Sequence, residues 1–536
     1  MKKQILFSIA LLTTGVTYAQ TSYDAAKYTH QELNGTARYV GMGGAMGALG
    51  ADLSTMGSNP AGIGLFRSST ASLTFGLNST QNKADFMGTQ ITQNKTRMSF
   101  DQVGFVSSTH VGNRSNVRFF NFGFNYQKRN NLNNVFHSAG VYPNGYSQTV
   151  QMGNMMADIG ITEDEFNKIY DYEKGVSPAG NNPYLIDRYP YLGVMGIRTG
   201  LVSLPKTGTA LKAFQADKFA YESTETGGIQ QFDVNISTNL NDRVYLGATI
   251  GAYYIDYKRS TFYKEAIYDG KQLSNGGFEI EGAYRILNDL KTEGTGLDIK
   301  LGAIFRPIED SPFRLGVAIH TPTWYQLQDT YSTFMESDIE YKDTPKTERR
   351  QIGEATYDYT NGDNLREYRL TTPWKFNVSA GTIVGGIMAI GAEYELADYS
   401  TASLKYNDGV PMTHQNDVIK STLNAVHTFK VGLETRLTPE FAIRAGYNYT
   451  SALFKKGAYK VLDTNDMRTD TEFSNTFARN TFTLGAGYSG KRFYADLAYK
   501  YDTTKSDFYT FSSDALAATK VTTDRHQVLC TLGLRF

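Results

Sequence analysis

The last residues of the chain constrain its fold more than any other segment. One face of this segment carries Val528, Cys530, Leu532, Leu534 and Phe536, and the other carries Gln527, Thr531, Gly533 and Arg535. Successive side chains of a strand point to opposite faces. A strand between lipid and a polar lumen requires this alternation, so the segment predicts a transmembrane β-barrel.

The rest of the sequence argues against helical membrane spans. After residue 19, no stretch approaches the roughly 18 consecutive apolar residues that a helical span needs. The chain contains 31 Phe and 37 Tyr beside 51 Gly and only 13 Pro, in many short alternating segments. This mixture fits long twisted strands with aromatic girdles at the membrane surfaces.

The N-terminus has the three parts of a secretory signal. Two lysines precede the apolar run 5–12, and small residues at Thr17 and Ala19 suit cleavage before Gln20. We therefore predict that residues 1–19 are a signal peptide. The exported chain is then expected in the bacterial outer membrane as a multi-pass β-barrel.

Short turn-forming segments divide the remainder into alternating runs, which predict an all-β, transmembrane antiparallel barrel of about 14 strands. The expected periplasmic turns are 113–116, 241–242, 307–312, 384–386, 438–439 and 489–491. The expected strands are 70–79, 99–109, 117–128, 230–240, 243–257, 295–306, 313–324, 366–382, 387–399, 425–437, 440–451, 479–489, 492–502 and 526–536.

The charges expected inside the barrel have both signs. They are Asp298, Lys300, Arg306, Glu393, Glu395, Lys430, Glu434, Arg436, Arg444, Asp496 and Lys500. A simple ion-selective pore is expected to show one sign. The mixture favours structural ion pairs around something that fills the lumen.

The segment before the first strand, residues 20–68, is rich in glycine and does not alternate. Its run 41–52 is followed by Asn59-Pro60-Ala61, where proline fixes φ and the asparagine side chain can bond nearby backbone. Small residues allow close backbone packing. We expect this segment to fold inside the barrel as a hatch, with residues 69–536 forming the barrel around it.

A glycine-rich run followed by Asn-Pro-Ala directly before the first barrel strand resembles the FadL/TodX family of outer-membrane transporters for hydrophobic compounds. The terminal Phe536 is similar to the assembly signal of bacterial outer-membrane barrels. The resemblance implies passive uptake of long-chain fatty acids or aromatic hydrocarbons, gated by the hatch residues Asn59, Pro60 and Ala61. It also implies a gap in the wall through which cargo leaves sideways. The implied partners are hydrophobic cargo, the outer membrane with its lipopolysaccharide, and the barrel assembly machinery.

The connection from about residue 129 to 229 is too long for an ordinary loop and must carry structure of its own. We predict an extracellular, pliable apolar groove for cargo, built from Met152, Met155, Met156, Ile159, Phe166, Tyr189, Tyr191 and Met195. Arg188 and Arg198 lie among them and are candidates to hold a carboxylate. The alternative is that these residues only form the small core of a cap.

Gly123 lies among aromatic residues of the third expected strand and is a candidate for a wall kink, although glycine in a strand also relieves crowding.

No cluster of acid, base and nucleophile predicts an enzyme, no cofactor is expected, and the balanced charge does not favour nucleic acid. Haem uptake is an alternative only if loops assemble ligands that spacing does not show. The main alternative is a PorV-like barrel partner of a protein secretion system.

Overall fold

The computed structural model describes residues 20–536 except 113–114, 144, 174–175, 179–180, 187, 205–210, 270–279, 342–353, 356–364, 463–465 and 514–515. The predicted signal peptide, residues 1–19, lies outside the described residues.

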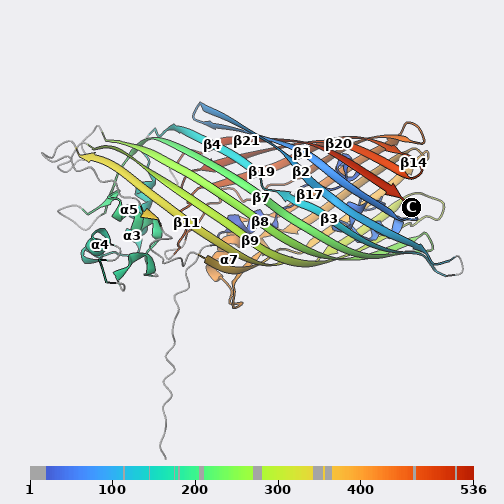
Figure 1. Cartoon of the computed structure of the whole chain (residues 1–536), viewed down its shortest axis with the longest axis horizontal. Coiled ribbons are helices and arrows are strands. Elements are labelled where there is room, and N and C mark those ends of the chain that lie inside the picture. The colour runs from blue at the N-terminus through green and yellow to red at the C-terminus, as the bar shows by residue number, and fades with distance from the viewer. Residues whose placement is uncertain are drawn as a thin grey trace, which may run out of the picture.

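Fourteen antiparallel strands close into one barrel within this described part of the chain (Figure 1). The seam is formed by the first and last strands, which pair from Thr70↔Arg535 to Asp85↔Lys520. Four barrel strands consist of consecutive pieces, namely β3 with β4, β10 with β11, β12 and β13 with β14, and β15 with β16. The bounds are β1 (Thr70–Phe86), β2 (Thr89–His110), β3 (Val117–Asn131), β4 (Asn134–Val141), β7 (Ala216–Leu240), β8 (Val244–Asp269), β9 (Ile280–Phe305), β10 (Arg314–His320), β11 (Trp324–Tyr341), β12 (Glu354–Ala355), β13 (Leu365–Thr371), β14 (Lys375–Val384), β15 (Met388–Asp398), β16 (Ser403–Tyr406), β17 (Ala425–Arg436), β18 (Phe441–Thr450), β19 (Phe473–Ser489), β20 (Phe493–Tyr509) and β21 (Thr519–Arg535).

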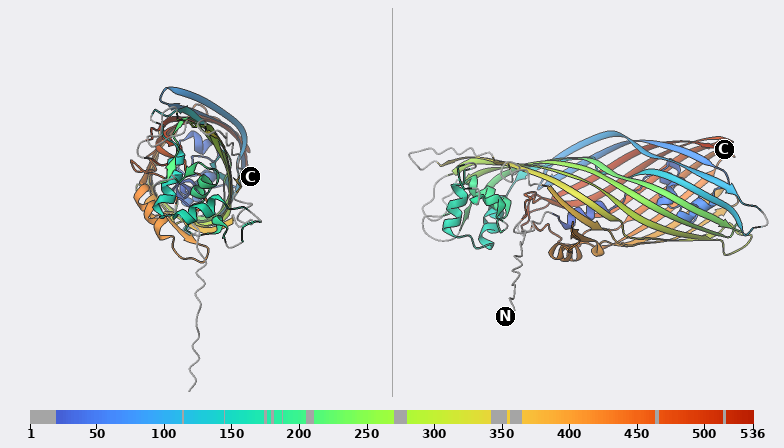
Figure 2. Two further views of the ribbon diagram at one scale, coloured as in Figure 1. Left: turned by 90° about the vertical axis from the view of Figure 1, so that its left-hand side faces the viewer. Right: turned by 60° about the horizontal axis from the view of Figure 1, so that its bottom comes forward.

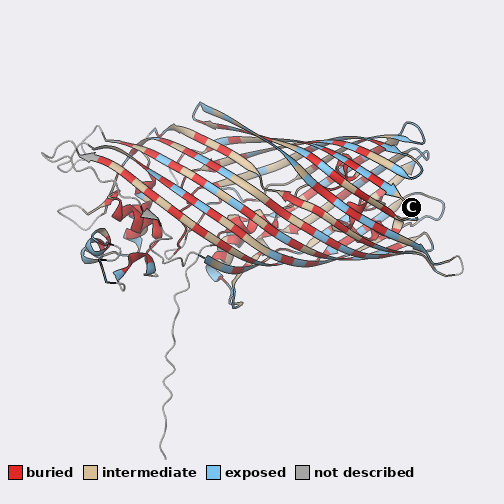
Figure 3. Cartoon of the chain, in the orientation of Figure 1, coloured by how far each residue is buried: buried red, intermediate tan, exposed pale blue. Residues whose placement is uncertain are grey.

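Alternating burial follows the strands around the barrel (Figure 3). On β18, Ile443 and Ala445 are exposed, whereas the intervening Arg444 is buried. Exposed apolar side chains form an outer belt that includes Phe75, Phe122, Ile250, Leu301, Val317, Val378, Val431, Leu484, Leu497 and Leu532. A closed barrel with an even strand number and such a belt is typical of bacterial outer-membrane proteins. The chain is an outer-membrane β-barrel.

None of the helices among the described residues is long and apolar enough to cross a bilayer.

The sequence analysis located the periplasmic end of all fourteen strands, but it predicted most of the strands too short. The strand expected at 243–257 extends to Asp269, and the strand expected at 479–489 begins at Phe473. Beyond the apolar belt the backbone ladder between β7 and β8 continues, but exposed positions become polar, as at Lys258 and Ser260. The alternation of apolar and polar residues therefore ends before the strand does.

The N-terminal segment, residues 20–68, lies inside the barrel (Figure 2). It contains α1 (Ser22–Thr29), α2 (Ala37–Gly41) and the 3-10 helices η1 (Leu53–Gly57) and η2 (Pro60–Leu65). Strand glycines make room for its backbone. A Cβ atom at Gly247 would lie 2.4 Å from the carbonyl carbon of Pro60, and one at Gly432 would lie 2.3 Å from the carbonyl oxygen of Met42.

The predicted extracellular connection is shorter than expected, because β4 and β7 occupy both of its ends. Its folded part forms a cap beyond one end of the barrel (Figure 1). The cap contains α3 (Gln148–Asp158), α4 (Glu163–Tyr170), η4 (Pro183–Leu185), α5 (Tyr191–Arg198), β5 (Val202–Ser203) and β6 (Lys212–Ala213). Two other elements, η5 (Tyr399–Thr401) and α7 (Thr413–Thr422), follow β15.

Candidate functional site

The cap buries most of the residues predicted to contact cargo. Met152, Met156 and Met195 are fully buried where α3 packs against α5, and Phe166, Tyr189 and Tyr191 are buried around them. Met155 and Ile159 are partly buried against the same cluster. In this structure these residues form the core of the cap. Their role in ligand binding stays a prediction.

The apolar core of the cap is continuous with the upper end of the barrel wall. The same cluster joins Met152 and Met195 to Phe86 of β1, Phe136 of β4 and Phe219 of β7. The rings of Phe86 and Phe219 lie 4.8 Å apart in an edge-to-face arrangement. An uninterrupted set of apolar side chains therefore leads from the cap helices to three barrel strands.

The two arginines proposed for carboxylate binding differ in their surroundings. Arg198 is buried, donates to the Tyr172 carbonyl oxygen and lies over the Tyr172 ring at 5.0 Å. Arg188 is about half exposed, and its Nη2 lies 3.2 Å from Glu165. Arg188 is therefore the more accessible of the two cations, since Arg198 is engaged within the cap.

A buried carboxylate attaches the cap to β8. Glu265 accepts hydrogen bonds from the backbone N–H of Gln148 at 2.9 Å and from Ser147, the N-cap residue of α3. Tyr263 also donates to this carboxylate. A negative charge at a helix N-terminus is stabilised by the exposed N–H groups there. Glu265 was not predicted, because nothing local in the sequence marks a strand carboxylate that will meet a distant helix end.

The backbone ladder of the wall is interrupted beside β4. β2 pairs with β3 from Gln102↔Gln127 to His110↔Phe119. Among the described residues, the remaining part of β2, Thr89–Asp101, pairs only with β1, whereas β4 pairs only with β7. We call this interruption, between Thr89–Asp101 and Asn134–Val141, the β2–β4 break.

Side chains, rather than backbone groups, connect the two sides of the break. Gln93 Nε2 lies 3.1 Å from His137 Nδ1, and Arg97 donates to Asn133 Oδ1 at 2.7 Å. The asparagine-rich stretch 130–134 provides a signal for this position, because asparagine favours turns over regular strands. That signal was not used in the sequence prediction.

Gly123, the predicted kink, lies in an unbroken part of the ladder. It pairs with Val106 on one side and Asn235 on the other. A Cβ atom at this position would lie 2.3 Å from Cε of Met56 in the N-terminal segment. The glycine therefore makes room for Met56. The register shifts of the third strand lie on either side of it, at residues 117–119 and 128–130.

The Asn59-Pro60-Ala61 corner packs against the inner wall. Asn59 Nδ2 donates to the Gly47 carbonyl oxygen at 2.8 Å, and its Oδ1 accepts from the Ala61 N–H at 3.2 Å. A Cβ atom at Gly302 would lie 2.1 Å from Asn59 Oδ1. The side chain of Asn59 thus closes a rigid corner that touches the wall directly.

The N-terminal segment also bonds to the strand that leads into the break. Asn130 donates to the His30 carbonyl oxygen at 2.7 Å and accepts from the Glu32 N–H at 3.1 Å. The Glu32 carboxylate accepts from the Asn131 N–H at 3.1 Å. Three hydrogen bonds therefore connect residues 30–32 with the end of β3.

A second connection is ionic and joins α1 to the segment before β19. Arg468 pairs with Asp24 at 2.5 Å and with Asp470 at 2.6 Å, and Lys460 pairs with Asp470 at 2.7 Å. Arg259 of β8 also pairs with Asp470. Burial alone would raise the pKa of Asp24 and Asp470, but Arg468 and Lys460 outweigh it and hold both pKa values below the ordinary range.

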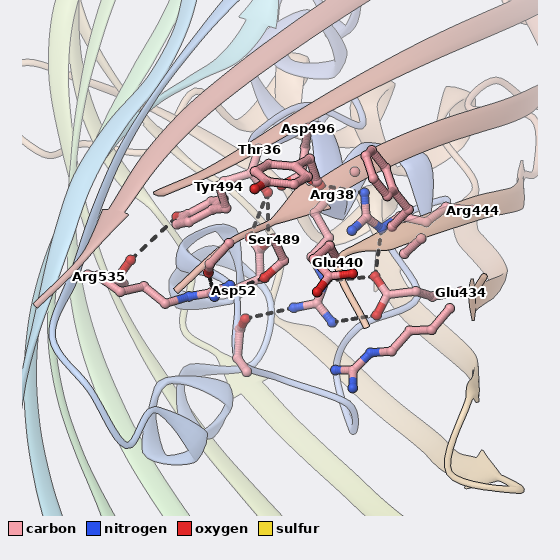
Figure 4. A pocket seen from close by; sticks show the side chains of 18 of the residues that line it. Thr36, Arg38, Asp52, Glu434, Glu440, Arg444, Ser489, Tyr494, Asp496 and Arg535 are labelled. Carbon is pink, nitrogen blue, oxygen red and sulfur yellow. Dashed lines mark hydrogen bonds and ion pairs between the residues drawn. The ribbon is translucent and has the colours of Figure 1, made fainter. Parts of the chain in front are cut away.

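At the periplasmic end, a cavity of about 770 Å³ lies below the N-terminal segment (Figure 4). Arg38 of α2 makes two hydrogen bonds to Glu434, at 2.9 and 3.0 Å. Arg444 bridges Glu434 and Asp496, both at 2.6 Å. These pairs border the cavity and connect α2 to three strands, as the mixed lumen charges predicted.

The sequence matches no protein-family model and no curated protein. Among solved structures, it is similar to a deltaS2 mutant of the TodX monoaromatic hydrocarbon channel, with a TM-score of 0.50 and 10% identity over 94% of this chain and 99% of that one. It is also similar to a Pseudomonas aeruginosa FadL homologue, with a TM-score of 0.49 and 14% identity over 94% and 99% of the two chains. The Pseudomonas putida toluene transporter TodX gives a TM-score of 0.48 and 11% identity over 95% and 100%. The first of these likenesses shows that the chain has the fold of the TodX channel.

Proposed function

We propose that this protein carries hydrophobic small molecules across the outer membrane without an energy source. Cargo binds first in the cap and leaves sideways through the β2–β4 break. The observation that carries the proposal is the apolar cluster that connects Met152 and Met195 of the cap with Phe86 and Phe136 beside the break. The TodX protein, whose fold this chain shares, is a monoaromatic hydrocarbon channel, which supports the same proposal.

A sideways route is favoured over a straight one by the contents of the lumen. Below the cap the barrel contains the N-terminal segment and buried ion pairs such as Lys430 with Glu393 and Lys300 with Asp233. Passing apolar cargo there would disrupt ion pairs in a buried environment. Entering the bilayer instead gains roughly 0.8 kcal/mol for each buried methylene.

The N-terminal segment supplies the gate in this proposal. Residues 30–32 bond to Asn130 and Asn131, at the irregular end of β3. A shift of the segment would release these bonds and let β3 and β4 move relative to β2. The Asn59-Pro60-Ala61 corner holds the other end of the segment against the wall.

The route is tested by bridging the break. In a Cys530→Ser background, Gln93→Cys and His137→Cys place two thiols on opposite sides of it, and a short reducible bis-thiosulfonate joins them. The matched control joins Val135→Cys to Thr224→Cys, which are already ladder partners on β4 and β7. We expect bridging across the break to abolish uptake of a labelled long-chain fatty acid or toluene, with recovery on reduction. Normal uptake by the bridged protein would exclude this exit.

The gate is tested separately with Asn59→Ala combined with Pro60→Ala. We expect impaired uptake while the barrel retains its heat-dependent shift in electrophoretic mobility. Normal uptake at normal expression would argue against gating by the corner. If neither this variant nor the wild type takes up either compound, the PorV-like alternative gains weight, and copurification of a secretion component becomes the deciding measurement.

A further inference from the structure

The periplasmic cavity has more cationic than anionic side chains in its lining. The cations are Arg38, Arg67, Arg436, Arg444, Lys491 and Arg535, and the anions are Asp52, Glu434, Glu440 and Asp496. Glu434 and Asp496 are occupied by Arg38 and Arg444. Asp52 accepts from Thr36 Oγ1 and the Ser54 N–H. Glu440 accepts from Thr438 Oγ1 at 3.3 Å. All four carboxylates therefore have partners within the protein.

The remaining cations lie toward the mouth of the cavity. Arg67 pairs with Asp242 at 2.9 Å, and Arg535 donates to Ser489 Oγ at 2.9 Å (Figure 4). Across the described part of the chain, no carboxylate forms an ion pair with Arg436 or Lys491. Both side chains are exposed at the barrel rim and line the cavity. They supply charged donors for an external anion.

The cavity extends across the rim to the lipid-facing surface. Its lining includes Phe441 and Tyr488, which are 54% and 40% exposed and face outward as ladder partners on β18 and β19. Their rings lie 5.3 Å apart. Aromatic residues at this level are typical of the membrane–water interface. A molecule in the cavity can thus place a charged group beside Arg436 while an apolar part lies against these rings.

We propose that this cavity binds the phosphate headgroup of an anionic phospholipid from the inner leaflet. The phosphate lies between Arg436 and Lys491, and an acyl chain passes over Phe441 and Tyr488 into the bilayer. Guanidinium and ammonium groups are the usual protein ligands of phosphate. A lipid is favoured over an acidic peptide because the cavity opens beside the aromatic residues that contact the membrane. The proposal does not depend on the transport function.

The test compares Arg436→Gln combined with Lys491→Gln against a control, Arg243→Gln. Arg243 is a rim cation outside the cavity lining, 3.9 Å from Glu309. Detergent-purified full barrels are titrated with dihexanoyl phosphatidylglycerol and observed by native mass spectrometry. We expect the double variant to bind this lipid about tenfold more weakly, which corresponds to about 1.4 kcal/mol, while the control binds like the wild type. Equal binding by the double variant and the wild type would overturn the proposal.

Two further titrations distinguish a phospholipid from the other anions that could bind here, free phosphate and an acidic peptide. Inorganic phosphate that displaces the lipid only at much higher concentration supports recognition of the phosphate as part of a lipid. If free phosphate binds as tightly as the lipid, the lipid assignment is overturned. A glutamate-rich peptide that displaces the lipid and binds more tightly would also overturn it, and would identify the cavity as a docking site for an acidic protein segment. Uptake is not measured, so failure here leaves the proposed transport untouched.

Discussion

At the scale of single residues, inward-facing glycines decide where the N-terminal segment touches the wall. Gly247 lies against the backbone of Pro60, and Gly432 lies against the carbonyl oxygen of Met42. In each case the atom that a Cβ would meet belongs to backbone, which cannot rotate away as a long side chain can. The fit of the segment therefore depends on the absence of a methyl group at a few wall positions.

Gly247→Val is expected to displace the Asn59-Pro60 corner and to cost about 1–3 kcal/mol, the usual range for overpacking. Limited proteolysis of the folded barrel measures this as faster cleavage within residues 20–68. Ala248→Val is the matched control, because Ala248 is the next residue and is exposed on the outer surface. Equal cleavage rates for the two variants would contradict close packing at this glycine.

The sequence patterns predicted the element on which a residue lies better than they predicted the residues that pack against it. The helical spacing of Met152 and Met156 is correct, since both lie on α3, but the spacing is the same for a cargo groove and for a buried core. Gly123 was singled out because it interrupts aromatic residues, whereas the register shifts lie on either side of it. Spacing determines which face of an element a residue occupies, but the residue that covers it comes from a distant part of the chain.

At the scale of elements, α1 is fixed to the extracellular side by charged residues of the segment before β19. Asp24, Arg468, Asp470 and Lys460 form a buried network in which each carboxylate has at least one cation. Removing Asp470 leaves Lys460 buried without the carboxylate that it pairs with, which costs about 3–5 kcal/mol. This network is one of the elements that must rearrange if the N-terminal segment moves.

The network gives a specific dependence on pH. Because the folded pKa values of Asp24 and Asp470 lie below the unfolded value of about 3.9, their stabilisation is complete above that value and is lost as the pH falls through the folded values. We expect the difference in thermal midpoint between wild type and Asp470→Asn to be constant from pH 8 to about 5 and to shrink below about 4. A difference that already shrinks between pH 8 and 6 would show that another group controls the contact.

Phe536, the residue directly after β21, is expected to affect assembly more than stability. Phe536 is 77% exposed, and its N–H donates to the Ser69 carbonyl oxygen at 3.0 Å. Deleting it removes one peripheral hydrogen bond, worth about 0.5–1.5 kcal/mol. We therefore expect nearly normal stability after refolding in detergent but reduced amounts in the outer membrane of cells. Wild-type amounts in cells would show that the terminal residue is not an assembly signal.

At the scale of the whole molecule, the alternation of apolar and polar residues predicted the barrel and its outer belt. It did not predict where the strands end on the extracellular side of the belt. The periodicity arises because lipid and lumen impose opposite demands on successive residues, and it ends where water replaces lipid. The same reasoning placed Cys530 on the lipid side, and the structure shows it exposed between Val528 and Leu532. Contacts between the N-terminal segment and the wall required the folded chain.

Labelling of Cys530 tests whether the outer face of β21 lies in the membrane. A charged maleimide does not enter the hydrocarbon layer, because burying a charge there is costly. We expect Cys530 in intact membranes to resist a charged maleimide and to react after denaturation. Thr92→Cys in a Cys530→Ser background is the positive control, because Thr92 is exposed on the part of β2 beyond the belt. Rapid labelling of Cys530 in membranes would mean that this strand does not face lipid.

The length of the strands sets how far the protein stands out from the cell. β8 contains 26 residues, whereas a tilted strand crosses the hydrocarbon layer with about 9–11. At about 3.3 Å per residue and a typical tilt, the remainder rises roughly 40 Å above the bilayer. The wall therefore extends well beyond the bilayer and presents the cap to the surrounding medium. Antibodies, phages and neighbouring cells would meet the cap before they meet the membrane.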